Sequence, residues 1–87
     1  MNIAPDIGEV LRRKDLSHVA VRTYLGVRVC YQGQGCWQSK ETIGVTCGLS
    51  VDGVSRGLRE LVKRGVLERT RRGGGLPSVY RSKLMGR

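Results

Sequence analysis

The chain has 87 residues, enough for one small hydrophobic core and too few for a second domain or a separate catalytic lobe. Sixteen lysines and arginines stand against seven aspartates and glutamates, so the net charge is +9. This excess favours polyanionic partners, and the 39% hydrophobic content excludes a disordered chain.

The positive charge is concentrated in the second half of the chain. Six basic residues and no acidic residue follow Glu68. A one-sided basic surface is typical of nucleic-acid-binding proteins, although a merely soluble basic protein is the alternative. A membrane-surface helix is disfavoured, because glycines interrupt the basic segment and it lacks a long apolar face.

Several features predict a cytoplasmic protein, at the prokaryotic nucleoid or, if viral, in the host cytoplasm. No apolar run approaches the ~20 residues of a transmembrane helix. The N-terminal residues lack the basic and apolar blocks of a signal peptide. Cys30, Cys36 and Cys47 have no C-x-x-C spacing, which indicates reduced, mostly buried thiols. A zinc site that uses all three with His18 is the alternative.

Apolar residues at helical spacing predict a short N-terminal helix, and they are Ile3, Ile7, Val10 and Leu11. Asp6 is the candidate N-cap, with Glu9 three residues later as the second member of a capping box. We interpret residues 1–15 as a helical extension that covers the core or forms a dimer contact.

A second helix is predicted over residues 18–30, with Ser17 as its N-cap. The many β-branched residues leave a strand as the alternative, but the length and the cap favour a helix. Residues 32–35, Gln-Gly-Gln-Gly, are predicted to be a loop. The apolar face of the helix consists of Leu16, Ala20, Tyr24 and Val27.

Two adjoining helices are predicted between residues 40 and 64. Ser39 caps the first, which ends at Gly48, a residue suited to the left-handed conformation. Ser50 caps the second, which runs through Arg64 and is ended by Gly65. The apolar residues of the first helix are Ile43, Val45 and Cys47. The predicted buried stripe of the second is Val54, Leu58, Leu61 and Val62.

Glycines inside these two helices need a structural reason, since each costs ~1 kcal/mol relative to alanine. Gly44 and Gly57 are predicted to let the two helices cross closely. Residues 66–72 and 78–83 predict two strands, and residues 73–77 a glycine-rich turn, which together make a β-hairpin with a basic tip. Trp37 is expected in the core or as a brace for the following helix, and Tyr80 in the core.

From Leu16 to Leu84 the chain resembles the winged helix-turn-helix domains of phage and plasmid replication proteins and of small prokaryotic regulators. The resemblance implies an α+β, mostly helical domain over residues 1–87, with a helical core at 16–65 and a C-terminal hairpin wing at 66–84. The residues that carry it are Leu16-Ser17, Cys36 to Ile43, Gly48-Leu49-Ser50, Val54, Leu58, Leu61, Lys63 to Leu67, and Ser78-Val79-Tyr80.

In that family, the helix after the Gly-Leu-Ser turn is the recognition helix. Asp52 departs from the family pattern and would repel a phosphate, which shifts weight to Arg56, Arg59 and the wing. The alternative for Arg56 is a surface ion pair with Glu60. The DNA-binding residues that the resemblance implies are Lys40, Ser50, Val51, Asp52, Gly53, Ser55, Arg56, Arg59, Lys63, Arg69, Arg71, Arg72, Gly73 and Gly74.

The resemblance implies sequence-specific binding of double-stranded DNA, in transcription regulation or in phage or plasmid replication or partition. One copy would cover a half-site, so we expect a homodimer. A protein-interaction module that binds or inhibits a partner protein is the alternative, and single-stranded RNA binding is disfavoured by the few aromatic residues. One histidine and no nucleophile–base pair argue against an enzyme, and we expect no cofactor or metal.

Overall fold

The computed structural model describes residues 4–85, which form four helices and a four-stranded antiparallel sheet. The α+β class expected from the sequence is confirmed, with about half of the residues helical. In chain order the elements are α1 (Pro5–Arg12), α2 (His18–Val29), β1 (Tyr31–Gln32), β2 (Gly35–Cys36), α3 (Lys40–Cys47), α4 (Val51–Lys63), β3 (Leu67–Thr70) and β4 (Val79–Ser82).

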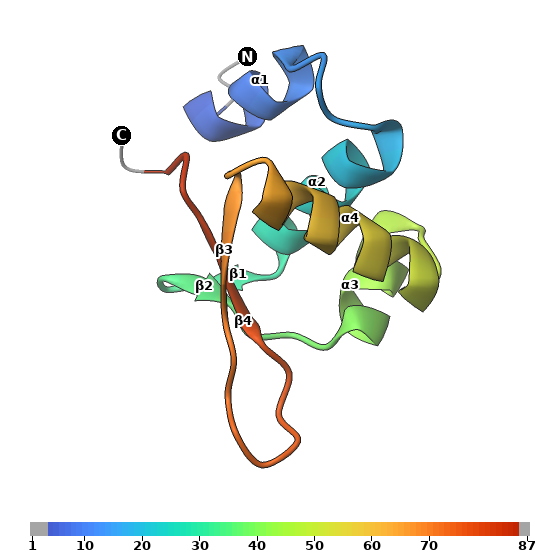
Figure 1. The fold of residues 1–87 in the computed structure, drawn as a ribbon, viewed down its shortest axis with the longest axis vertical. Helices are drawn as coiled ribbons and strands as arrows, with labels where there is room; N and C mark the ends of the chain where they lie inside the picture. Colours follow the sequence, from blue (N-terminus) through green and yellow to red (C-terminus); the bar gives the residue numbers. More distant parts are fainter. Residues whose placement is uncertain (1–3, 86–87) are drawn as a thin grey trace.

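The long β3–β4 hairpin extends away from the helices, and its loop lies at the end of the molecule opposite α1 (Figure 1). The strand order is β1-β2-β4-β3. Residues 32–35 were predicted to be a loop, but they belong to a small β1–β2 hairpin. Cys36 of this hairpin pairs with Tyr80 of β4, which joins it to the sheet. Such two-residue strands depend on a distant partner, so no local pattern predicts them.

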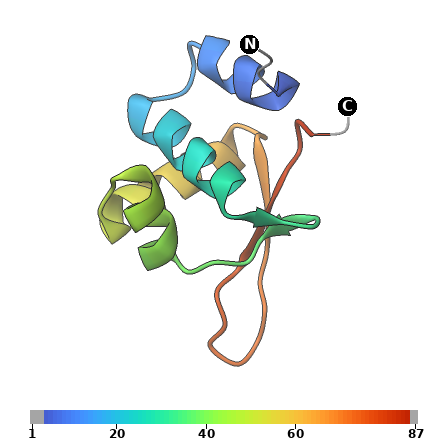
Figure 2. The same ribbon diagram turned by 180° about the vertical axis from the view of Figure 1, so that it is seen from behind.

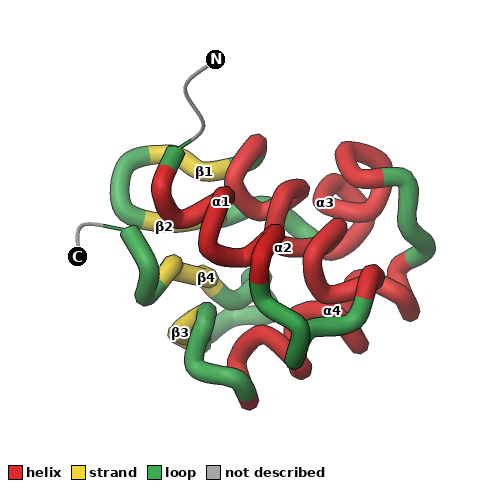
Figure 3. Tube along the Cα trace, turned by 90° about the horizontal axis from the view of Figure 1, so that it is seen from above, coloured by secondary structure: helices red, strands yellow, loops and turns green. Residues whose placement is uncertain are grey.

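Helix α2 is central and packs against both α3 and α4 (Figure 3). Its predicted apolar face is confirmed as buried. The predicted burial of Val62, at the edge of the α4 stripe, is wrong, because this side chain is exposed. Among the apolar residues of α3, Val45 is 86% exposed. Val45 lies two residues from the buried Ile43, which places it on the opposite side of the helix.

The predicted serine caps are confirmed. The side chains of Ser17, Ser39 and Ser50 accept hydrogen bonds from the backbone N–H groups of residues 20, 42 and 53. Gly48 adopts the predicted left-handed conformation at the end of α3, with φ 73°. The beginnings of α2, α3 and α4 and the end of α3 therefore lie where the sequence indicates.

The predicted cap at Asp6 is wrong, because α1 begins at Pro5 with Ala4 as its N-cap, and Ile3 lies outside the described residues. Asp6 is buried instead and accepts hydrogen bonds of 2.6 Å from Tyr24 Oη and Arg28 Nε. Burial alone would raise the pKa of Asp6, but these two bonds, the charge of Arg28 and a backbone hydrogen bond together lower the pKa. The carboxylate thus anchors α1 to α2.

Gly44 and Gly57 lie at close contacts, as predicted, but with different partners. A Cβ on Gly57 would overlap the side chain of Thr23 on α2, and one on Gly44 would lie 2.5 Å from the carbonyl oxygen of Leu49 in the turn. The prediction that both glycines serve a close crossing of α3 and α4 is therefore wrong for Gly57, which faces α2. It holds only in part for Gly44, whose Cβ would also lie 3.4 Å from Val54 Cγ2 of α4. The close helix crossing is between α2 and α4, and it sets the position of α4.

Candidate nucleic-acid interface

Cationic side chains from three elements meet in a hollow of about 190 Å³ between α4 and the sheet. Lys40 is the first residue of α3, Arg59 lies on α4 and Arg69 lies on β3. We call this site the cationic hollow. Its complete lining is Lys40, Ser55, Leu58, Arg59, Val62, Arg69 and Tyr80.

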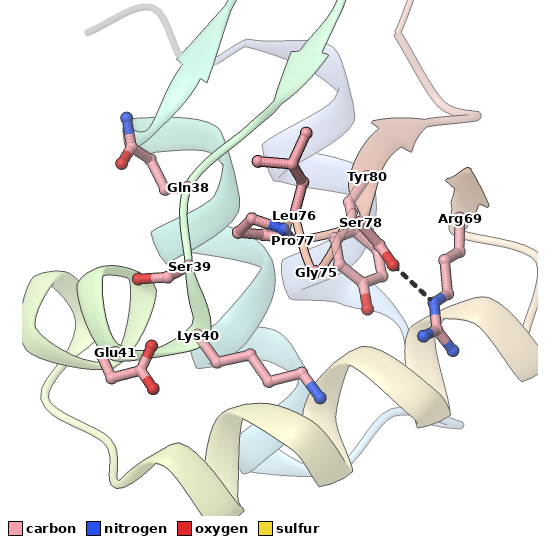
Figure 4. Close-up of a pocket in the computed structure, with 10 residues that line it drawn as sticks. All are labelled: Gln38, Ser39, Lys40, Glu41, Arg69, Gly75, Leu76, Pro77, Ser78 and Tyr80. Carbon is pink, nitrogen blue, oxygen red and sulfur yellow. Dashed lines mark hydrogen bonds between the residues drawn. The ribbon is translucent and has the colours of Figure 1, made fainter. Parts of the chain in front are cut away.

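A second hollow of about 290 Å³ adjoins the first and extends beneath the loop between β3 and β4 (Figure 4). The two share Lys40, Arg69 and Tyr80. Figure 4 shows Lys40 and Arg69 reaching toward the same opening from either side of Tyr80. Arg69 Nε donates a hydrogen bond of 3.1 Å to Ser78 Oγ, which holds the guanidinium across the hairpin. We call this second site the wing hollow.

The register of the hairpin explains why Arg69 faces the helices. Arg69 pairs with Tyr80 across β3 and β4, so the two side chains share one face of the sheet. Tyr80 is buried in the core, as predicted, and therefore marks this face as the inner one. Within residues 4–85, the side chains of Lys40 and Arg59 form no hydrogen bond or ion pair. The cations of the hollow are available to an anionic ligand.

The first turn of α4 is exposed and contains an internal ion pair. Asp52 accepts hydrogen bonds from Nε and Nη2 of Arg56, and both side chains are 73% exposed. The Arg56–Glu60 pair considered as the alternative is not formed, because Arg56 pairs with Asp52 and Glu60 accepts two bonds of 2.7 Å from the backbone N–H and Oγ of Ser17. These bonds lower the pKa of Glu60 and link α4 to the start of α2.

The two arginines of the wing loop differ in their surroundings. Arg71 is exposed and has no bonding partner within residues 4–85. Arg72 is half-buried, with its guanidinium carbon 4.8 Å from the centre of the Trp37 ring and its Nε 2.7 Å from the carbonyl oxygen of Pro77. Trp37 is 42% exposed, so the core interpretation of this residue is wrong. Trp37 and Arg72 together brace the wing loop.

The fold brings only part of the predicted DNA-binding set to the cationic hollow. Lys40, Ser55, Arg59 and Arg69 line it, whereas the other predicted residues lie outside it. Tyr80 and Gln38 line the hollows but were not predicted, because their positions depend on the sheet register and on the β2–α3 connection. The predicted residues elsewhere are Ser50, Val51, Asp52, Gly53, Arg56 and Lys63 on or next to α4, and Arg71, Arg72, Gly73 and Gly74 in the wing loop.

Within residues 4–85, no three His, Cys, Asp or Glu side chains are placed to hold a metal ion, so the zinc alternative has no geometric support. No described helix is long and apolar enough to cross a membrane. Comparison of the chain with protein-family models, with curated proteins and with solved structures finds no match.

Proposed function

We propose that the protein is a winged helix-turn-helix protein that binds double-stranded DNA sequence-specifically. Its role would be in transcription regulation, or in the replication or partition of a phage or plasmid. The observation that supports this proposal is the convergence of Lys40, Arg59 and Arg69 on one opening between α4 and the β3–β4 hairpin. A duplex presents phosphates on both sides of a groove, and a helix flanked by cations matches that pattern.

In this proposal, α4 lies in the major groove and the β3–β4 hairpin contacts the backbone or the minor groove. The exposed positions of α4 include Arg56, Arg59 and Lys63. The capped start of α3 is next to Lys40, where backbone N–H groups and a lysine favour a phosphate together. One protein molecule covers a half-site, so we propose a homodimer on an inverted or direct repeat.

The test is the fluorescence anisotropy of a labelled random-sequence duplex pool, followed by sequencing of the bound fraction. With about six phosphate contacts, the affinity should fall by roughly 10³-fold between 50 and 200 mM salt. Arg59→Ala should weaken binding. Arg81→Ala is the matched control, because residue 81 follows Tyr80 on β4 and faces the other side of the sheet. Equal binding to a single-stranded pool, or no salt dependence, would contradict the proposal.

A protein-interaction module remains the second candidate, because the first turn of α4 exposes Val51 beside Asp52. An acidic, partly apolar turn is unfavourable against a phosphate backbone and suits a protein surface. Charge removal separates the two candidates: Arg59→Ala together with Arg71→Ala should reduce DNA binding and leave an interface centred on Val51 intact.

A further inference from the structure

A groove of about 630 Å³ with an apolar floor lies between the end of α1 and the outer face of α2. Figure 2 shows α1 and the start of α2 at the end of the molecule away from the wing loop. We call it the α1–α2 groove. Its apolar lining is Leu11, Leu16, Val21 and Leu25, and its polar lining is Arg13, Lys14, His18 and Arg22.

The apolar floor of the groove is partly exposed to solvent. Leu11 is 51% exposed, and Val21 and Leu25 are half-buried beside it. A concave apolar surface with a polar rim is typical of a protein–protein interaction site.

The walls of the groove are fixed before any partner binds. Asp6 holds α1 to α2 through Tyr24 and Arg28, and Tyr24 Oη also bonds with Ser82 Oγ at 2.7 Å. Val10, next to Leu11 on α1, is fully buried. A preformed groove lowers the entropic cost of binding, because the protein does not have to order its own side of the interface.

The rim of the groove carries a net positive charge. No acidic residue lines it, and the adjacent Asp15 is paired with Arg13, which leaves that pair neutral. Lys14 and Arg22 have no acidic partner within residues 4–85. The groove is therefore complementary to a ligand that combines apolar side chains with negative charge.

We propose that the α1–α2 groove binds an acidic amphipathic helix of a partner protein. Such a helix would place a stripe of leucine-like side chains on the floor and its carboxylates against Lys14 and Arg22. This inference is independent of DNA binding, because the groove shares no residue with the cationic hollow.

Two other occupants fit the groove less well. A second copy joined by a two-fold axis would place one basic rim against another, and like charges oppose that interface. A bilayer requires a protruding apolar face, whereas this surface is concave. Several acidic residues are also bonded within the chain, among them Asp6, Asp15, Asp52 and Glu60.

The test is an NMR titration of the ¹⁵N-labelled full chain with a synthetic helical peptide of about 15 residues, near the minimum length for a stable helix. The peptide carries leucine at i, i+3, i+4 and i+7 and glutamate at its other positions. We expect amide shifts at Leu11, Val21 and Leu25 and none at Arg59 or Arg69. A DNA duplex added to the complex should leave the groove shifts in place.

Charge reversal supplies the specific control. The double variant Lys14→Glu/Arg22→Glu should bind the acidic peptide about tenfold more weakly, and should instead bind the same peptide with lysine in place of glutamate. The variant Arg81→Glu/Lys83→Glu changes the net charge equally at residues that do not line the groove, and it should bind the acidic peptide as the wild type does.

Four results would overturn the proposal. They are the absence of groove shifts at millimolar peptide, equal weakening in both charge-reversed variants, self-association that Leu11→Ser abolishes, and groove shifts caused by anionic phospholipid vesicles but not by the peptide. Because DNA binding is measured separately in the same variants, failure of this proposal and failure of the proposed function give different results.

Discussion

The cationic hollow and the α1–α2 groove are both basic, but their charges have different surroundings. In the hollow, Lys40, Arg59 and Arg69 stand around a tyrosine between a helix and a hairpin. In the groove, Lys14 and Arg22 stand around exposed aliphatic side chains. A phosphate backbone offers no partner for an apolar floor, whereas an acidic helix does. In these two proposals the atoms around the charges, more than the net charge of +9, select the class of anionic partner.

Both surfaces depend on the close crossing of α2 and α4, so the largest effect should come from Gly57→Ala. Its Cβ would overlap Thr23, and we expect the free energy of unfolding to fall by at least ~2 kcal/mol, despite the better helix propensity of alanine. Gly53→Ala on the same helix is the control, since a Cβ there has ordinary contacts from 3.4 Å. Urea unfolding followed by circular dichroism measures both variants. Equal stability of the two would show that the crossing does not need glycine.

The second prediction separates the surfaces. Asp6→Asn should lower the free energy of unfolding by about 2 kcal/mol, because the charge-assisted bond from Arg28 is lost and α1 loosens. Peptide binding in the α1–α2 groove should weaken, while DNA binding should remain. If DNA binding falls as much as peptide binding, the two surfaces are not independent.

The same variant has a pH signature. The pKa of Asp6 is lowered in the folded protein from its ordinary value of 3.8, so its ionised form stabilises the fold above that pH. This contribution is lost as the pH falls through the lowered folded pKa. The stability difference between wild type and Asp6→Asn should therefore be full at pH 7 and shrink below about pH 4. A difference that is constant from pH 7 to pH 3 would contradict the ionised anchor.

A third prediction concerns the wing loop beside the cationic hollow. Arg72→Ala should change the emission of Trp37, the single tryptophan, because it removes the guanidinium stacked on the ring. Arg71→Ala should leave that emission unchanged and make the plot of log affinity against log salt shallower by about 1. Identical fluorescence in the two variants would mean that Arg72 does not brace the loop.

The smallest effect should come from Asp52→Asn, which frees Arg56 and removes a negative charge from the first turn of α4. We expect DNA affinity at low salt to rise by about two- to fivefold, because one repulsive charge is removed from the DNA-facing turn. Stability should hardly change, since exposed ion pairs contribute little to it. A fall in affinity would indicate that Asp52 contacts a base. Peptide binding in the α1–α2 groove should not change.

Local signals in the sequence predict much of the helical part of the fold. The serine caps and Gly48 specify where helices begin and end, because each acts on a backbone group three or four residues away. The spacing of apolar residues in α2 and α4 likewise identifies most of the buried faces.

Features that depend on distant partners could not be predicted in this way. The local sequence predicts Asp6 as an N-cap, but in the fold its carboxylate bonds to Tyr24 and Arg28, which are distant in the sequence. The β1–β2 hairpin exists because Cys36 pairs with Tyr80. For the candidate site, the residue types and the α4 positions follow from the sequence. The grouping of Lys40, Arg59 and Arg69 requires the packing of α3, α4 and β3.

The most direct test of the account is the salt dependence of duplex binding in two double variants of equal charge change. Arg59→Ala/Arg69→Ala should make the plot of log affinity against log salt shallower by about 2, since each lost phosphate contact removes ~0.9 from the slope. Lys14→Ala/Arg22→Ala should leave the slope at the wild-type value. The account would be contradicted if the two variants changed the slope equally, or if only the groove variant changed it.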